Sequence, residues 1–479
     1  MNLREKCAQM VVGAYWFNDQ EYEGAIELAR AGAGGFIFFG GSIDDVATMA
    51  NSLQRKGEHA LFIAADYENG AGQQVPGATE FPSSMAIGAS GSIDHAKSKA
   101  VATATEASEM GVNWIFAPVV DLNTNPENPV IGTRSFGSNG EKTVLLAKAY
   151  LSGLREKGVL GCAKHFPGHG SLNVDSHLEL PDSSVSKEEL MAGEVRPYVE
   201  LGSDLDAIMT SHVRYKEIDA EKPASLSSVI TGELLRKELG FKGLVVTDAL
   251  MMGAIENEDE AILSAAEAGA DLLLMPKDPM KAIETLVSGV ESGRLSEEVV
   301  NRACDRILTA KENLGLVAKQ KVKMTELQSR MNLQAHRDLA QSIAEATITQ
   351  VKGDCVVEGD CFYVHVADPR KVKGDVSFFE KHLQTGIGRM VIGVFWSPQA
   401  FSGETKIPDH LYERIVASLK QDPDAVVVSF GSPYILRQLP DVKNFACAYS
   451  NCVASQRSAA WAVQGKIPFR GILPVEIDG

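Results

Sequence analysis

Short apolar runs recur along the first part of the chain and alternate with longer segments that carry apolar residues at helical spacing. The helical segments include 95–110 and 228–240. Such alternation of strand and helix is typical of a parallel α/β fold. The apolar runs are eight in number and span residues 10–15, 34–39, 61–66, 114–121, 159–166, 207–213, 243–249 and 270–276.

Continuous apolar strands, buried on both faces, favour a closed (β/α)8 TIM barrel over a doubly wound open sheet. The polar residues support this choice, because a barrel gathers its active site at the C-terminal ends of its strands. One polar residue at such a place could be a simple loop cap, but six in phase are poorly explained that way. These six are Asp66, Asp121, Lys164, His165, His212 and Asp248.

A second, smaller α/β pattern follows the barrel. We expect a TIM-barrel catalytic domain over 1–315, a polar linker helix over 316–345 and a C-terminal α/β sandwich domain over 346–479. The strands expected in the last part are 361–368, 389–396, 425–433 and 444–450, with an edge strand from the final PFRGILPVEI.

The balance of charges and the cysteine pattern exclude several classes of protein. A formal net charge of −17, without an extended lysine or arginine cluster, argues against a nucleic-acid or anionic-membrane partner. Seven scattered cysteines without a C-x-x-C pair indicate neither a disulfide framework nor a zinc site. The first residues lack the pattern of a signal peptide, so we expect a cytoplasmic protein, although a chain whose signal peptide had been removed would read the same way.

Lys164 to His177 reads KHFPGHGSLNVDSH and gathers three of the ten histidines. The i, i+4 spacing of His165 and His169 suits zinc only on a helix, which Pro167 and the nearby glycines prevent. GHGSLN is a weak match to a phosphate loop. Proton transfer fits better, because Asp175 lies two residues from His177 and can fix its tautomer and stabilise its charged form. We expect no metal and no cofactor.

A carboxylate is available across the barrel mouth from this loop. Asp248 follows the strand GLVVTDALMM with no other charged residue beside it. An acid/base group and a carboxylate on either side of a sugar-sized gap are the equipment of glycoside hydrolysis. The sequence therefore predicts a sugar substrate.

Three long motifs stand in order along the chain: PVVDLNTNPENPVIGTRSFG, then KHFPGHG followed by DSH, then VVTDALMMGAI. Together they closely resemble the glycoside hydrolase family 3 β-N-acetylglucosaminidases, from about Leu3 to Gly315, and the C-terminal part resembles the α/β sandwich domain of that family. The resemblance implies a retaining, exo-acting enzyme that removes terminal β-linked N-acetylglucosamine from cell-wall or chitin-derived glycans.

The resemblance also assigns roles to individual residues. Asp248 matches the nucleophile that forms a covalent glycosyl-enzyme intermediate, and His177 matches the general acid/base, in a dyad with Asp175 on a mobile loop. Gly168 and Gly170 would be hinges of that loop. The residues that match the binding groups for sugar hydroxyls are Asp66, Arg134, Lys164 and His165.

Other interpretations stay open beside this one. The family writes D-Q-E-G-G-x-V-x-R where this chain has DYENGAGQQV, so Gln74 stands in place of an arginine and the preferred sugar is less defined. An N-acetylglucosaminide phosphorylase or a β-glucosidase could use the same residues, and a non-catalytic sugar-binding protein could keep the pocket. His169 is expected to orient the loop by a backbone hydrogen bond rather than to act chemically. His212 either supports neighbouring groups or faces the sugar. Every candidate precedes Gly315, so we expect the barrel to hold the catalytic groups without help from the C-terminal domain.

Overall fold

The computed structural model describes residues 1–18, 22–316, 321–372 and 374–477. All eight apolar runs form barrel strands, and the fifth run is divided into two short strands around Cys162. The strands are β1 Val11–Trp16, β2 Gly35–Phe39, β3 Phe62–Ala65, β4 Trp114–Ile115, β5 Leu160–Gly161, β6 Ala163–Phe166, β8 Ala207–Thr210, β10 Leu244–Thr247 and β11 Leu273–Leu274.

Parallel pairing joins these strands into a ring. One sheet has the order β11-β1-β2-β3-β4-β5 and another has the order β10-β8-β6. Single parallel bridges, Val119 with Lys164 and Val246 with Leu272, connect the two sheets. The predicted TIM barrel is therefore confirmed, and the C-terminal ends of its strands open on one face.

Helices cover the outside of the barrel, and this is why its strands carry no alternation of polar and apolar residues. In α3, for example, Ser42 and Asp45 form a capping box, and Val46, Ala50 and Leu53 are buried against the strands. The helical segments are α1 Leu3–Gln9, α2 Tyr22–Arg30, α3 Ile43–Lys56, α4 Ser84–Ser90, α5 Ile93–Glu109, α6 Gly140–Glu156, α7 Lys187–Ala192, α8 Arg196–Leu201, η5 Ser228–Glu238, α9 Glu258–Ala268, α10 Pro279–Glu291 and α11 Glu297–Asn313. A separate two-stranded sheet pairs β7 Asp182–Ser183 with β9 Arg214–Tyr215.

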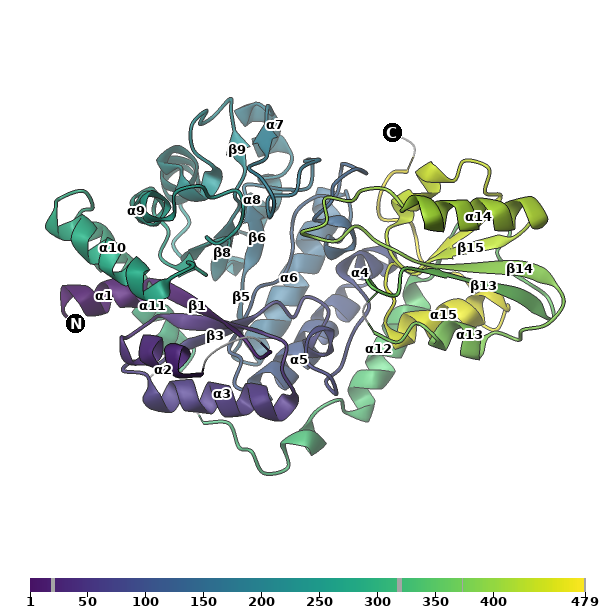
Figure 1. Ribbon diagram of the computed structural model, residues 1–479, viewed down its shortest axis with the longest axis horizontal. Helices are drawn as coiled ribbons and strands as arrows, with labels where there is room; N and C mark the ends of the chain where they lie inside the picture. Colours follow the sequence, from purple (N-terminus) through teal and green to yellow (C-terminus); the bar gives the residue numbers. More distant parts are fainter. Residues whose placement is uncertain (19–21, 317–320, 373, 478–479) are drawn as a thin grey trace.

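The C-terminal domain is a five-stranded sheet between two layers of helices (Figure 1). Its strand order is β12-β16-β15-β14-β13, and β12 alone is antiparallel. Helix α14 covers one face of the sheet, and α13 and α15 cover the other. The bounds are α12 Gln334–Thr347, β12 Thr349–Lys352, β13 Cys361–Ala367, α13 Phe378–His382, β14 Arg389–Phe395, α14 Asp409–Gln421, β15 Val426–Ser429, β16 Asn444–Cys447 and α15 Val453–Val463.

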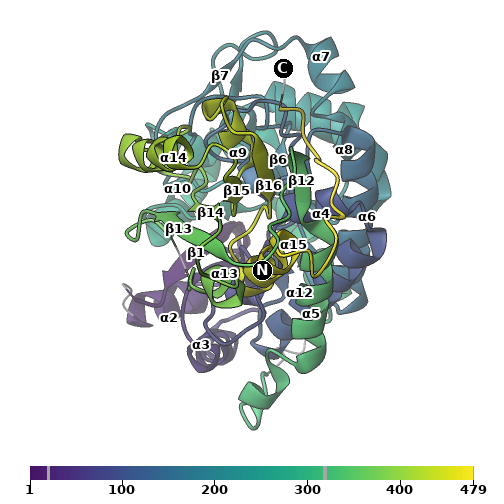
Figure 2. The same ribbon diagram turned by 90° about the vertical axis from the view of Figure 1, so that its right-hand side faces the viewer.

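Two expectations for this part of the chain change. Of the segment 316–345, predicted as one linker helix, residues 317–320 lie outside the described ranges. The described part has a short 3-10 helix, η7 Leu327–Arg330, and becomes α-helical as α12 from Gln334, where it runs beside α5 (Figure 2). The edge strand expected from the final residues is wrong, because the edge is β12 and residues 468–477 form no strand. Prolines remove backbone donors from this tail, which crosses to the barrel instead: Ile472 N donates to Ala89 O and Pro474 O accepts from Ser138 N.

The two domains share a packed interface. Met85, Ala86 and Ala89 of α4, a barrel helix, are buried in the same hydrophobic cluster as the C-terminal sheet. Tyr434 Oη donates to Asn123 O at 3.0 Å across the interface. The C-terminal domain is therefore held against the barrel beside the open ends of the strands. In the described ranges, the molecule has no helix both long and apolar enough to cross a bilayer.

Candidate active site

A cavity of about 370 Å³ opens at the C-terminal ends of the barrel strands. All four residues predicted to bind sugar hydroxyls line it, as do Asp248 and His177. Apolar side chains close the remaining wall, which is typical of small-molecule sites. They include Trp16, Phe39, Phe116, Met251, Met252 and Phe401.

A buried carboxylate, Glu68, holds the two cations of the cavity in place. Its side chain is 5% exposed and accepts from Arg134 Nε at 3.0 Å and Nη2 at 2.8 Å. Lys164 Nζ lies 2.8 Å from the same carboxylate and 2.7 Å from Asp66 Oδ1. Burial alone would raise the pKa of Glu68, but the charges of Arg134 and Lys164 hold that pKa below its usual range. The carboxylate and both cations are therefore charged at neutral pH.

Sequence reasoning missed Glu68. The signal was present, because Glu68 stands two residues after Asp66 in DYENG and can share its side of an extended segment. Gln74, which replaces the family arginine, bonds backbone groups: Nε2 donates to Asp66 O at 3.2 Å and Oε1 accepts from Gly40 N at 3.4 Å. At this position an amide therefore ties the Asp66 segment to the loop after β2.

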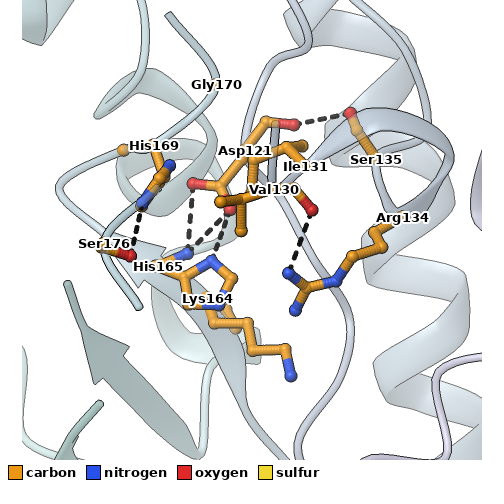
Figure 3. Close-up of polar contacts among 12 residues, drawn as sticks. Asp121, Val130, Ile131, Arg134, Ser135, Lys164, His165, His169, Gly170 and Ser176 are labelled. Carbon is orange, nitrogen blue, oxygen red and sulfur yellow. Dashed lines mark hydrogen bonds and ion pairs between the residues drawn. The ribbon is translucent and has the colours of Figure 1, made fainter. Parts of the chain in front are cut away.

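His165 is oriented by a buried aspartate. Asp121 Oδ2 lies 2.7 Å from His165 Nδ1 and both carboxylate oxygens accept from the His165 backbone N–H (Figure 3). Since Nδ1 is engaged, Nε2 is the ring nitrogen that can meet a ligand. The charged ends of Lys164 and Arg134 extend beside this histidine. Strand β6 and the 3-10 turn Gly132–Arg134 thus present several donors to one ligand.

Asp248 follows β10, and its backbone N–H donates to Thr210 O on the adjacent strand. Burial would raise the pKa of Asp248, but His165, His212 and His177 hold it below its usual range, so the group is a carboxylate. His212 bonds Ser225 Oγ at 2.7 Å through Nδ1 and Ala249 O at 3.0 Å through Nε2. Both ring nitrogens of His212 are used, so it supports the Asp248 segment and has no ring nitrogen left for a sugar.

The dyad expected from the DSH motif is formed. Asp175 Oδ1 lies 2.7 Å from His177 Nδ1 and accepts from the His177 backbone N–H at 2.9 Å. Burial opposes the charge on Asp175, but these bonds hold its pKa below the usual range. The His177 side chain is 17% exposed and lines the cavity. The structure thus brings the imidazole and Asp248 to the same cavity.

The loop from Phe166 to His177 is fixed along its first half. Tyr215 Oη donates to Gly168 O, Asn128 Nδ2 donates to His169 O, and Glu194 Oε1 accepts from Ser171 N. Gly168 and Gly170 are tightly packed, because a Cβ on Gly170 would lie 1.8 Å from Leu122 O and one on Gly168 would lie 2.4 Å from Glu194 Cβ. Close approach of the backbone therefore requires glycine at both positions.

His169 orients the loop through a bond to a side chain instead of the expected backbone hydrogen bond. Its Nε2 bonds Ser176 Oγ at 2.9 Å, and burial lowers the pKa of His169 to about 4, so the ring is neutral. Asp121 thus orients His165, and Ser176 holds His169. Across the residues that the structure describes, no group of three or more His, Cys, Asp or Glu side chains could hold a metal ion.

One lining residue comes from the C-terminal domain, which corrects the expectation that the barrel acts alone. Phe401 lies in the loop between β14 and α14, which extends toward the barrel mouth (Figure 1). Its backbone N–H donates to Asp175 Oδ2 at 2.7 Å, and its ring centroid lies 4.2 Å from that of His177. No local pattern in the sequence marks this contact, because 226 residues separate the partners.

We predict that Glu68→Gln destabilises the protein by on the order of 3 kcal/mol at pH 7, because two cations would then face a neutral amide. The pKa of Glu68 is depressed in the folded state, so its contribution is complete above the unfolded value of about 4.3 and is lost as the pH falls. Urea unfolding should show that the difference in free energy of unfolding between the native protein and the variant decreases below about pH 5. The control is Glu156→Gln, whose pair with Lys97 is about half exposed and should change stability by less than about 0.5 kcal/mol. Equal changes in the two variants would contradict this view of Glu68.

Comparisons with known proteins agree with this geometry. The family model of the glycosyl hydrolase family 3 N-terminal domain matches residues 2–310. The chain is 32% identical over 447 residues to β-hexosaminidase A of Pseudoalteromonas piscicida, covering 85% of this chain and 72% of that protein. A solved family 3 β-N-acetylglucosaminidase from Paenibacillus sp. str. FPU-7 is 28% identical with a TM-score of 0.88, covering 100% of this chain and 99% of that one. A solved β-glucoside phosphorylase is 25% identical with a TM-score of 0.90, covering 100% of this chain and 94% of that one. The chain belongs to glycoside hydrolase family 3, and the protein is a glycoside hydrolase.

Proposed function

We propose that the protein is a retaining, exo-acting β-N-acetylglucosaminidase that removes terminal β-linked N-acetylglucosamine from cell-wall or chitin-derived glycans. The observation that carries the proposal is the presence of Asp248 and the Asp175–His177 dyad in one cavity of about 370 Å³. A nucleophile and a general acid that face the same sugar are the requirement for retaining hydrolysis. The similar β-hexosaminidase and β-N-acetylglucosaminidase support this choice of sugar.

In the proposed reaction, the Asp248 carboxylate attacks the anomeric carbon while His177 gives its proton to the departing glycosidic oxygen. A covalent glycosyl-enzyme ester forms and the leaving sugar departs as an alcohol. His177, now neutral, then takes a proton from water as that water attacks the anomeric carbon, and the ester bond to Asp248 breaks with net retention. Asp175 stabilises the imidazolium at the stage when His177 is charged.

The residues proposed to bind the sugar hydroxyls include both hydrogen-bond acceptors and hydrogen-bond donors. Asp66 can accept hydrogen bonds, whereas Lys164, Arg134 and His165 can donate them. Because Glu68 and Asp121 already hold three of these side chains, little side-chain freedom is lost when a sugar binds. A preorganised set of hydrogen-bonding side chains of this kind supports the binding of one terminal sugar residue.

Two related enzyme activities and a protein without activity are the alternatives to this proposal. An N-acetylglucosaminide phosphorylase or a β-glucosidase is the alternative, because a neutral histidine tolerates an anionic acceptor and one similar structure is a β-glucoside phosphorylase. A sugar-binding protein without activity is disfavoured by the complete set of Asp248, Asp175 and His177.

The proposed location of the protein is the cytoplasm. The seven cysteines are all buried thiols, which supports a reducing, cytoplasmic compartment.

We predict that the full chain hydrolyses a nitrophenyl β-N-acetylglucosaminide without phosphate and acts more slowly on the matching glucoside. The released sugar should be free N-acetylglucosamine at both low and high phosphate concentrations. Product analysis by mass spectrometry separates the reactions. A sugar 1-phosphate as the main product would establish the phosphorylase instead, and the absence of any turnover would favour a binding protein.

We predict that Asp248→Ala lowers turnover by at least ~10³-fold, as expected for the loss of a covalent nucleophile. A fluorinated glycoside should trap the intermediate on the native enzyme, and peptide mass spectrometry should find the label on the peptide that contains Asp248. Label on another carboxylate would refute this assignment.

We predict that His177→Ala loses kcat/KM by ~10²-fold or more on a disaccharide, but by less than ~10-fold on a dinitrophenyl glycoside. A good leaving group departs without a proton, whereas a sugar alcohol does not. Because kcat/KM reports the first chemical step, the later use of His177 as a base does not affect this comparison. Equal losses on both substrates would show that His177 is not the acid.

A further inference from the structure

We infer that Phe401 of the C-terminal domain is a positioning residue for the general acid, and that its backbone N–H holds the Asp175–His177 dyad in its working orientation. The inference rests on the proposed function, in which His177 delivers the proton. It makes the active site a product of both domains, although every side chain with a chemical role belongs to the barrel.

The hydrogen bonds of Asp175 show what Phe401 adds. Oδ1 serves His177 alone, accepting from its ring at 2.7 Å and from its backbone N–H at 2.9 Å. Oδ2 accepts from Phe401 N at 2.7 Å. Both bonds from His177 come from the loop that carries Asp175, and this part of the loop is tied to the barrel by Gly253 N, which donates to His177 O at 3.0 Å. None of these bonds engages Oδ2 of Asp175. The bond from Phe401 fixes the second oxygen to another domain.

The backbone at Phe401 is held in an unusual conformation. Its φ is +69°, in the left-handed region that aromatic residues rarely adopt. Such conformations persist where the surroundings impose them, and they concentrate at functional sites. Inside the loop, Ser402 N donates to Gln399 O, and Gln399 Nε2 donates to Lys371 O at 2.9 Å. The C-terminal domain therefore sets the position of the Phe401 N–H.

The base of this loop is also anchored within its own domain. Lys371 Nζ pairs with both oxygens of Glu404, at 2.5 and 2.6 Å. The domain is in turn attached to the barrel through the cluster around Met85 and through the bond from Tyr434 to Asn123. A continuous set of contacts thus runs from the barrel through the C-terminal domain and back to the dyad.

The Phe401 ring has a separate place in the site. It packs on the His177 imidazole with centroids 4.2 Å apart, while 68% of the residue stays exposed. The ring covers one side of the imidazole and lines the cavity. Ring and N–H can be removed independently, which makes their contributions separable.

The decisive experiment replaces the peptide N–H of residue 401 by an ester oxygen in the full chain, through incorporation of phenyllactic acid at that position. This exchange keeps the ring and removes the donor to Asp175. We expect kcat/KM on a disaccharide to fall about tenfold or more, because a hydrogen bond to a charged group is lost, and kcat/KM on a dinitrophenyl glycoside to fall less than about threefold. The control is phenylalanine introduced at 401 by the same method.

A second variant tests the ring. Phe401→Asn keeps the N–H, and asparagine tolerates the left-handed conformation. The ratio of its kcat/KM values on the two substrates should stay within about threefold of the native ratio, because the donor remains. If Phe401→Asn reproduced the selective loss of the ester, the role of the N–H would be overturned.

The ester experiment has three possible results, of which one supports the inference and two overturn it. A selective loss on the disaccharide supports the inference. Equal losses on both substrates, or no loss, overturn it, since a role in folding alone lowers the amount of active enzyme for every substrate. The His177→Ala variant, measured in parallel, separates failure of the inference from failure of the proposed function. If His177→Ala loses activity equally on both substrates, the assignment of His177 as the acid fails. If His177→Ala is selective for the disaccharide and the ester variant is not, only the inference about Phe401 fails.

Discussion

A carboxylate buried between two cations organises one side of the cavity at the barrel mouth. Glu68 comes from the segment after β3, Arg134 from the loop after β4 and Lys164 from β6, so one set of ion pairs connects three successive parts of the barrel rim. Burial of a single one of these charges would be costly, and their contact makes all three tolerable. The same contact directs the lysine and the arginine into the cavity, where His165 is held beside them by Asp121.

The acid side of the cavity is organised differently. The first half of the loop from Phe166 to His177 is packed against the barrel through Tyr215, Asn128 and Glu194. Glycine stands at the two points of closest approach. Its second half carries Asp175 and His177 and is reached by the loop of the C-terminal domain. The proposed general acid/base thus lies at the meeting point of two domains, whereas the side chains proposed to bind the sugar belong to the barrel alone.

Much of this arrangement was accessible from the sequence because it is local. The eight apolar runs correspond to the eight strand positions of the barrel, since strands buried on both faces need continuous apolar residues. Asp66, Lys164, His165 and Asp248 lie at or near the C-terminal ends of those runs, and the geometry of a parallel barrel brings such positions together without further information. Asp175 and His177 are two residues apart, so their contact also needed only the local chain.

What depended on distant contacts was decided by the tertiary structure alone. Glu68 gains its role from Arg134, 66 residues away, and Asp121 gains its role from His165, 44 residues away. Residues 468–477 turn toward the barrel instead of adding a strand, because Ala89 and Ser138 provide backbone partners there. Phe401 meets Asp175 across 226 residues. A periodic pattern reports which face of an element is buried, and it carries no record of which distant backbone N–H will complete the bonds of a buried carboxylate.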